Sequence, residues 1–197
     1  MEDLKHPCTV LKHHINLTTN IPVRSHPYRV SEPDRLIIND QIQKMLKAGI
    51  IRQSNSPYAS PVLLRAKKGT TEKRFCIDSR KVNAITVVDP HPIPRIDDIF
   101  DSLIDCDIFT TLDLKAGYWQ IAIAEEDCHK LAFVVPDGHY EPTRVCYGMR
   151  NGGSNLCRAM FIILGNLNFV KIYIDDITIK GKGFKQSLEH LKIVSNF

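Results

Sequence analysis

Apolar residues recur at helical spacing in several parts of the chain. Ile38, Ile42 and Met45 repeat every three to four residues, which predicts one buried stripe along a helix. Ser31 stands where the N-cap of this helix is expected, with an acid three residues later, and Gly49 is placed to end it. Further helices are predicted over residues 95–103, 154–164 and 188–194.

Short runs rich in β-branched and aromatic residues predict strands between these helices. Two pairs of runs should form hairpins, one around a basic loop at Gly69 and one around Asp137-Gly138, which signals a tight turn. The first 30 residues look extended, because Pro22 and Pro27 break any helix. Strands are predicted over residues 50–51, 61–66, 74–77, 108–112, 119–124, 131–135, 140–145, 170–174 and 177–179. They outnumber the helices in a mixed order, so the expected fold class is α+β.

The composition is that of an ordinary globular chain. Of 197 residues, 43% are hydrophobic and 24% are charged, which excludes disordered and fibrous classes. The longest apolar run, residues 159–164, is too short to span a membrane, and the chain begins without an apolar signal core. The six cysteines are therefore expected to be free thiols. They show no zinc spacing with histidine, and His13-His14 is expected to be solvated rather than a ligand pair.

Charge is unevenly distributed along the chain. Residues 62–82 carry seven basic and two acidic side chains, whereas residues 83–129 carry ten acidic and two basic ones. Beyond residue 176 the balance is basic again, with four lysines against one glutamate. Basic flanks around an acidic centre suit a polyanion held beside a cation site. On charge alone, a mosaic of solvated faces is the simpler interpretation.

Two adjacent aspartates, Asp175 and Asp176, separate two apolar strands and would lie at the tip of a hairpin. Asp113 ends another apolar strand, so Asp113 and Asp175 would meet if the two strands are neighbours. Carboxylates in such a group suit magnesium, and two magnesium ions suit phosphoryl transfer. A surface turn rich in aspartate is the simpler alternative. A glycosidase also uses two carboxylates, but only Trp119 hints at a sugar platform.

Four stretches, in this order, resemble the reverse transcriptase of gypsy-type long-terminal-repeat retrotransposons and, more distantly, retroviral enzymes. They are residues 49–61, 74–83 (RFCIDSRKVN), 111–121 (TLDLKAGYWQI) and 173–176 (YIDD). The similarity covers residues 13–195, which would form the reverse transcriptase domain. A single Tyr-x-Asp-Asp box is a weak signal, but four ordered blocks are highly specific.

The resemblance implies a right-hand polymerase fold that lacks its thumb. The fingers would comprise residues 1–88, with an extended arm over the first 30, and residues 121–149. The palm would comprise residues 89–120 and 150–197. Family enzymes continue into a thumb and ribonuclease H, so the chain is expected to be one segment of a longer Pol polyprotein. The family also implies a cytoplasmic retrotransposon particle, and no membrane partner is expected.

The reaction implied is the addition of deoxynucleotides to a primer 3′ end on an RNA or DNA template. Two Mg²⁺ ions would serve it, with Mn²⁺ as a possible substitute. The catalytic and metal-binding carboxylates would be Asp113, Asp175 and Asp176. The first two would hold both ions, and Asp176 would support the site and the primer end.

The resemblance also implies contacts to the incoming deoxynucleoside triphosphate. The backbone amides of Ala116 and Gly117 would face the triphosphate, and the Arg74 guanidinium would grip it bidentately. Tyr118 would lie under the sugar and exclude a 2′-hydroxyl by steric clash, its alternative role being core packing beside Trp119. The remaining implied contacts are Tyr147 and Gly148 in the nucleotide pocket and Lys67 or Lys68 at the triphosphate.

Four departures from the family pattern keep a second hypothesis open. Residues 141–149 are eroded, with Pro142 where the family has an aromatic residue, and Gly153 replaces a common proline. Residues 180–183 are unusually rich in glycine and lysine, and the thumb is missing. The alternative is a catalytically silent remnant that acts at most as a nucleic-acid-binding module. A third class, a protein-interaction module, predicts no salt-dependent binding of nucleic acid.

Overall fold

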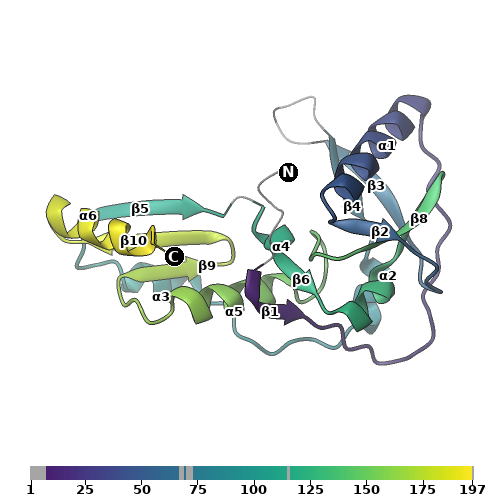
Figure 1. Cartoon of the computed structure of the whole chain (residues 1–197). Coiled ribbons are helices and arrows are strands. Elements are labelled where there is room, and N and C mark those ends of the chain that lie inside the picture. The colour runs from purple at the N-terminus through teal and green to yellow at the C-terminus, as the bar shows by residue number, and fades with distance from the viewer. Residues whose placement is uncertain (1–7, 67–68, 70–72, 115, 197) are drawn as a thin grey trace. The chain divides into compact units, whose positions relative to one another are not determined.

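The computed structural model describes residues 8–66, 69, 73–114 and 116–196, so Lys67 and Lys68 lie outside the described residues. The chain divides into two compact units (Figure 1). Unit 1 comprises Met1–Val88 with Tyr118–Gly152, and unit 2 comprises Asp89–Gly117 with Gly153–Phe197. Both contain helices and sheets in mixed order, which confirms the α+β class. The assignment of fingers and palm to residue ranges stays a prediction.

Unit 1 contains a five-stranded sheet. Its strands are β2 (Ile51–Gln53), β3 (Ser60–Ala66), β4 (Lys73–Ile77), β7 (Phe133–Val135) and β8 (Gly138–Pro142). Their order in the sheet is β2-β8-β7-β3-β4. Both predicted hairpins are present, since β3 pairs with β4 and β7 pairs with β8, each antiparallel. A parallel pairing of β3 with β7 joins the two hairpins.

Helix α1 (Glu32–Lys47) confirms the prediction from apolar spacing. The Ser31 hydroxyl caps it by accepting a hydrogen bond from the Asp34 N–H at 3.3 Å. Ile38, Ile42 and Met45 are buried, as a single apolar stripe requires. Local sequence signals therefore suffice to place this helix.

A parallel pair of short strands, β1 (Cys8–His13) and β6 (Ile121–Ile123), completes the strands of unit 1. The strand predicted over residues 119–124 is wrong in its first part, because helix α4 (Gly117–Gln120) precedes β6. Alternation over so few residues cannot locate where a strand begins. His13 is 3% exposed, so the expectation of a solvated doublet is wrong for this residue, while His14 is exposed.

Two short helical segments of unit 1 were not predicted. Helix α2 (Arg80–Ile85) buries only Val82, so it shows no apolar period. The 3₁₀ segment η2 (Glu125–Leu131) begins with three acidic residues and buries Asp127, Cys128 and Leu131. Segments this short carry too few positions for a periodic signal.

Unit 2 is built on a three-stranded antiparallel sheet with the order β5-β10-β9. The strands are β5 (Ile108–Asp113), β9 (Val170–Tyr173) and β10 (Asp176–Gly181). The helices are α3 (Ile96–Asp101), α5 (Gly152–Leu164) and α6 (Gly183–Val194). Helix α6 begins five residues before the predicted start at residue 188. No described helix is both long and apolar enough to cross a membrane.

Helix α6 packs closely on β10 and β5. A Cβ at Gly181 would lie 2.4 Å from Ser187 Oγ and 3.0 Å from the Ser187 backbone, so glycine permits the approach. The His190 ring stacks on Phe169 with centroids 3.8 Å apart, and its Nδ1 lies 2.7 Å from the Lys180 carbonyl. These contacts fix one end of β10, whose other end carries Asp176.

Candidate active site

A two-residue turn joins β9 to β10. Tyr173 and Asp176 are cross-strand partners, so Ile174 and Asp175 form the turn between them. Ile174 has a φ of 56°, a left-handed conformation that β-branched residues rarely adopt. Backbone strain of this kind persists only where surrounding structure holds it, and it clusters at functional sites. The turn therefore presents Asp175 from a constrained backbone.

Asp113 lies opposite Asp176 in the antiparallel pair of β5 and β10. Cross-strand partners point to the same face of a sheet, so both carboxylates occupy one face. The Leu114 N–H donates to the Asp175 carbonyl at 3.2 Å, which ties the segment after Asp113 to the turn. The predicted neighbourhood of the two strands is confirmed, and their register makes Asp176 the direct partner of Asp113.

The chemistry of these three donors fits a hard divalent cation. Asp113 and Asp176 are exposed, and Asp175 is half-buried. Like charges at one end of a sheet disfavour each other unless a cation neutralises them. Among the described residues, only a trio in unit 1 brings three ligand atoms within 4.8 Å, so the aspartates are more widely spaced. Carboxylates spaced in this way leave room for water or phosphate oxygens around a divalent ion.

The turn after Asp113 contains Ala116 and Gly117, the two residues with predicted amide contacts to triphosphate. Ala116 has a φ of 53°, and the Gly117 N–H donates to the Leu114 carbonyl at 3.2 Å. A Cβ at Gly117 would lie 3.2 Å from Leu114 Cβ and 3.4 Å from the Leu156 side chain. The Gly117 amide is thus engaged in its own turn, and the anion contacts of Ala116 and Gly117 stay predictions.

The predicted site residues are divided between the two units. Unit 2 holds Asp113, Ala116, Gly117, Asp175 and Asp176. Unit 1 holds Arg74, Tyr118, Tyr147 and Gly148.

In unit 1, Tyr118 and Tyr147 are brought together. Their ring centroids are 5.0 Å apart at an interplanar angle of 53°, and Tyr147 is 51% exposed. A Cβ at Gly152 would lie 3.2 Å from the Tyr118 ring and 3.4 Å from Val145, so Gly152 lets the ring sit close to the backbone. Tyr118 thus has Tyr147 as an aromatic neighbour, and its role under the sugar stays a prediction.

Asn83 is a site residue that sequence reasoning missed. Its side-chain amide donates to the Gly148 carbonyl at 2.7 Å, and its Oδ1 accepts from the Arg150 N–H at 3.0 Å. The Arg150 guanidinium donates a hydrogen bond of 2.8 Å to the Asn83 carbonyl. Gly148, at a φ of 89°, is held by these bonds beside Tyr147. Asn83 ends the block 74–83, but nothing local indicates its partner 65 positions later.

Arg74 lies on β4 directly opposite Arg65 on β3, and both side chains are exposed. Two guanidinium groups on adjacent strands repel each other unless an anion lies between them. The hairpin therefore offers a two-arginine surface to phosphate. Arg65 was not predicted, because its role depends on the strand register.

In the eroded segment only Glu141 and Pro142 belong to a strand, and residues 143–149 form a bend, an isolated bridge and a turn. Pro142 is the last residue of β8 and pairs with Ile51, and the Thr143 N–H still donates to the Ile50 carbonyl at 2.9 Å. Proline at a strand end removes no ladder bond that the sheet needs. Burial raises the pKa of the Cys146 thiol to about 12, so this residue is an apolar packing group.

Comparisons with known proteins identify relatives of this chain. The chain is similar to the Pol polyproteins of transposons 297 and gypsy of Drosophila melanogaster. Both are 39% identical to it, over 93% and 91% of this chain and 18% of each polyprotein. The chain thus spans less than a fifth of the length of these curated relatives.

Solved structures and a family model complete the comparison. A foamy viral protease-reverse transcriptase in complex with an RNA/DNA hybrid superposes with a TM-score of 0.83. It covers 97% of this chain and 25% of that chain, and at 22% identity it shows the fold alone. Residues 66–197 match the model of the family described as reverse transcriptase (RNA-dependent DNA polymerase). The chain therefore belongs to the reverse transcriptase family, in agreement with the resemblance of its four sequence blocks.

Proposed function

We propose that this chain is the catalytic segment of an RNA-directed DNA polymerase, which adds deoxynucleotides to a primer 3′ end on an RNA or DNA template. One observation carries the proposal: Asp113 faces Asp176 across β5 and β10, and Asp175 occupies the adjoining turn. Membership of the family supplies the reaction class. In this assignment unit 2 is the palm and unit 1 the fingers.

Reverse transcriptases are in general dependent on divalent metal ions. For this chain we infer Mg²⁺, held by Asp113, Asp175 and Asp176, because three carboxylates with room for water and phosphate are what Mg²⁺ takes. When bound, two ions would stabilise charge on the attacking and leaving oxygens of phosphoryl transfer. The protein would contribute by positioning the three carboxylates, because the constrained turn and the β5–β10 register bring them to one end of the sheet.

We propose nucleotide contacts for each unit separately. In unit 1, Arg74, assisted by Arg65, would bind triphosphate oxygens through planar, bidentate hydrogen bonds. In unit 2, the Ala116 amide would offer an oriented N–H group to an anion. Tyr118, supported by Tyr147, would exclude a ribose 2′-hydroxyl by steric clash.

The proposed macromolecular partner is a template-primer duplex. Two solved relatives of similar fold are foamy viral proteins in complex with an RNA/DNA hybrid and with double-stranded DNA. The curated relatives are much longer polyproteins, so a thumb and ribonuclease H would come from other segments of such a chain. A cytoplasmic retrotransposon particle stays a prediction.

A second candidate is a segment that binds nucleic acid without catalysis. The observation that favours it is the exposed pair of Arg65 and Arg74, which can hold backbone phosphate whether or not the aspartates act.

Primer extension in the presence of Mg²⁺ separates the two candidates. The 197-residue chain is compared with Asp175→Asn as the blank and Asp97→Asn, an exposed carboxylate on α3, as the matched control. The polymerase proposal requires extension by the wild type and the control above the blank. Salt-dependent duplex binding with no extension above the blank would instead establish the binding segment.

A further inference from the structure

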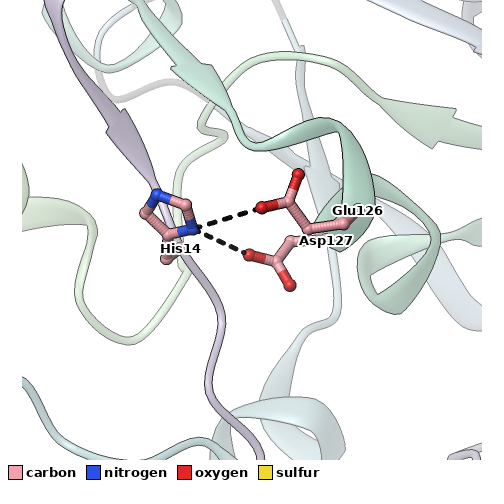
Figure 2. Close-up of side chains that lie close together, drawn as sticks. All are labelled: His14, Glu126 and Asp127. Atoms are coloured by element: carbon pink, nitrogen blue, oxygen red, sulfur yellow. Dashed lines mark ion pairs between the residues drawn. The ribbon is translucent and has the colours of Figure 1, made fainter.

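A second group of possible metal ligands lies in unit 1. His14 directly follows β1, and Glu126 and Asp127 belong to η2, more than 100 positions later in the sequence. Figure 2 shows the His14 imidazole facing both carboxylates. Its Nδ1 lies 3.7 Å from Glu126 Oε1 and 3.4 Å from Asp127 Oδ2. One ligand atom from each of the three residues lies within 4.8 Å of the others.

The two distances match those between metal ligands better than those of hydrogen bonds. An N–H···O hydrogen bond spans about 2.7–3.2 Å, which is shorter than either distance. Zinc bonds of about 2.0–2.2 Å in a tetrahedral site place neighbouring ligand atoms roughly 3.3–3.6 Å apart. The observed 3.4 and 3.7 Å are close to the edge of such a tetrahedron.

The backbone that carries the three ligands is fixed by several bonds. The Ile15 N–H donates to Asp127 Oδ2 at 3.0 Å, and the Ala124 N–H donates to the His13 carbonyl at 2.9 Å. The Lys130 ammonium donates to the Ile15 carbonyl at 2.7 Å. Outer bonds of this kind orient metal ligands and reduce the entropy lost on binding.

Asp127 is held as a carboxylate. Burial raises its pKa, but the Lys130 ammonium and the Ile15 N–H outweigh burial and lower the pKa overall. Lys130 contacts the other carboxylate oxygen, Oδ1, which leaves Oδ2 facing His14. The side chains of His14 and Glu126 are 59% and 71% exposed, so water can reach a fourth coordination position.

We propose that His14, Glu126 and Asp127 bind one Zn²⁺ ion, with water as the fourth ligand, and that the ion fastens β1 to η2. Zinc accepts mixed nitrogen and oxygen ligands in tetrahedral geometry, whereas Mg²⁺ prefers six oxygens. The proposal is independent of the polymerase function. The competing explanation is a plain ion pair between a protonated His14 and the two carboxylates.

Calorimetric titration of the reduced, metal-free chain with Zn²⁺ tests the proposal. We expect one equivalent to bind in the presence of millimolar Mg²⁺. His14→Ala and Glu126→Gln should each weaken this binding at least tenfold. Glu125→Gln is the matched control, because Glu125 is the neighbouring acid but pairs with Arg52, and it should bind Zn²⁺ like the wild type. Asp127 is left intact, because it also holds Ile15 and Lys130.

Cobalt substitution identifies the ligands, because the six cysteines are alternative ligands for zinc. The bound Co²⁺ should give a visible spectrum without thiolate charge-transfer absorption, and His14→Ala should abolish that spectrum while the circular dichroism of the chain stays unchanged. The proposal is overturned if the wild type binds no Zn²⁺, if His14→Ala and Glu126→Gln bind like the wild type, or if the bound cobalt shows thiolate ligation.

Discussion

Asp113 and Asp176 are Cα partners at the end of the β5–β10 ladder, so two carboxylates face each other across a strand pair. Like charges directly opposite in a sheet are destabilising. A surface that binds no ion would be more stable if one of the two carboxylates were replaced, whereas a cation site needs both. At the proposed metal site, the pair would link the stability of unit 2 to metal binding.

Asp113→Asn should leave the fold intact and raise the free energy of unfolding by about 0.5–1 kcal/mol without metal, because it removes repulsion between exposed charges. Added Mg²⁺ should raise the melting temperature of the wild type more than that of the variant. Thermal unfolding with and without Mg²⁺ measures both effects, with Asp97→Asn as the control. A variant less stable than the wild type in metal-free buffer would show that Asp113 has a structural role instead.

Ile174→Gly should stabilise the chain by about 1 kcal/mol, because glycine adopts a φ near 56° without the steric cost that isoleucine has there. The comparison variant is Ile172→Gly, on the regular strand β9, which should lower stability. Denaturant unfolding measures the free energy of unfolding, which should rise in Ile174→Gly and fall in Ile172→Gly. If both glycines destabilise to the same extent, the turn at Ile174 is not strained.

Gly181→Ala should destabilise the chain by about 1–3 kcal/mol, because the added Cβ meets Ser187 Oγ and the Ser187 backbone. Adding Ser187→Gly removes the hydroxyl contact and should restore part of the loss. Chemical denaturation of the single and double variants measures this coupling. Additive effects in the double variant would argue against close packing of α6 on β10.

Acid should weaken one contact of α1 over a defined pH range. Hydrogen bonds from Arg35 and then Asn39 lower the pKa of Asp137 to about 2 from its ordinary value of 3.8. Because the folded-state pKa is the lower one, this contact contributes fully above pH 3.8 and is lost as the pH falls toward 2. Unfolding curves should show the stability difference between wild type and Asp137→Asn shrinking across that range. A difference that stays constant down to pH 2 would contradict the assignment.

Features with local causes could be predicted from the sequence. The cap at Ser31, the apolar stripe of α1 and the hairpin of β7 and β8 each depend on a few neighbouring residues, and the structure confirms them. The hairpin turn lies at Pro136-Asp137, one residue before the predicted Asp137-Gly138, because Gly138 already pairs with Val135. The Tyr-x-Asp-Asp box was placed on a hairpin because two apolar strands flank it. Resemblance to the family added the reaction class, which no local pattern contains.

Features that depend on strand register or distant partners could not be predicted. That Asp113 faces Asp176 rather than Asp175 follows from the two-residue turn and the register of β10 on β5. The bond from Asn83 to Gly148 crosses 65 positions. His14 meets Glu126 and Asp127 only because β1 lies beside β6 in parallel, and such a pairing leaves no periodic signal.

A single-nucleotide incorporation assay shows whether Asp113 and Asp176 act together in polymerisation. A primed template, one complementary deoxynucleotide and Mg²⁺ are mixed with the wild type, Asp113→Asn, Asp176→Asn and the control Asp97→Asn, each shown to be folded. We expect incorporation by the wild type and the control. In Asp113→Asn and Asp176→Asn the incorporation rate should fall by about 1,000-fold or more, because several kcal/mol of transition-state charge stabilisation disappear. Incorporation by Asp113→Asn or Asp176→Asn at the wild-type rate, or none by the wild type above these variants, would contradict this expectation.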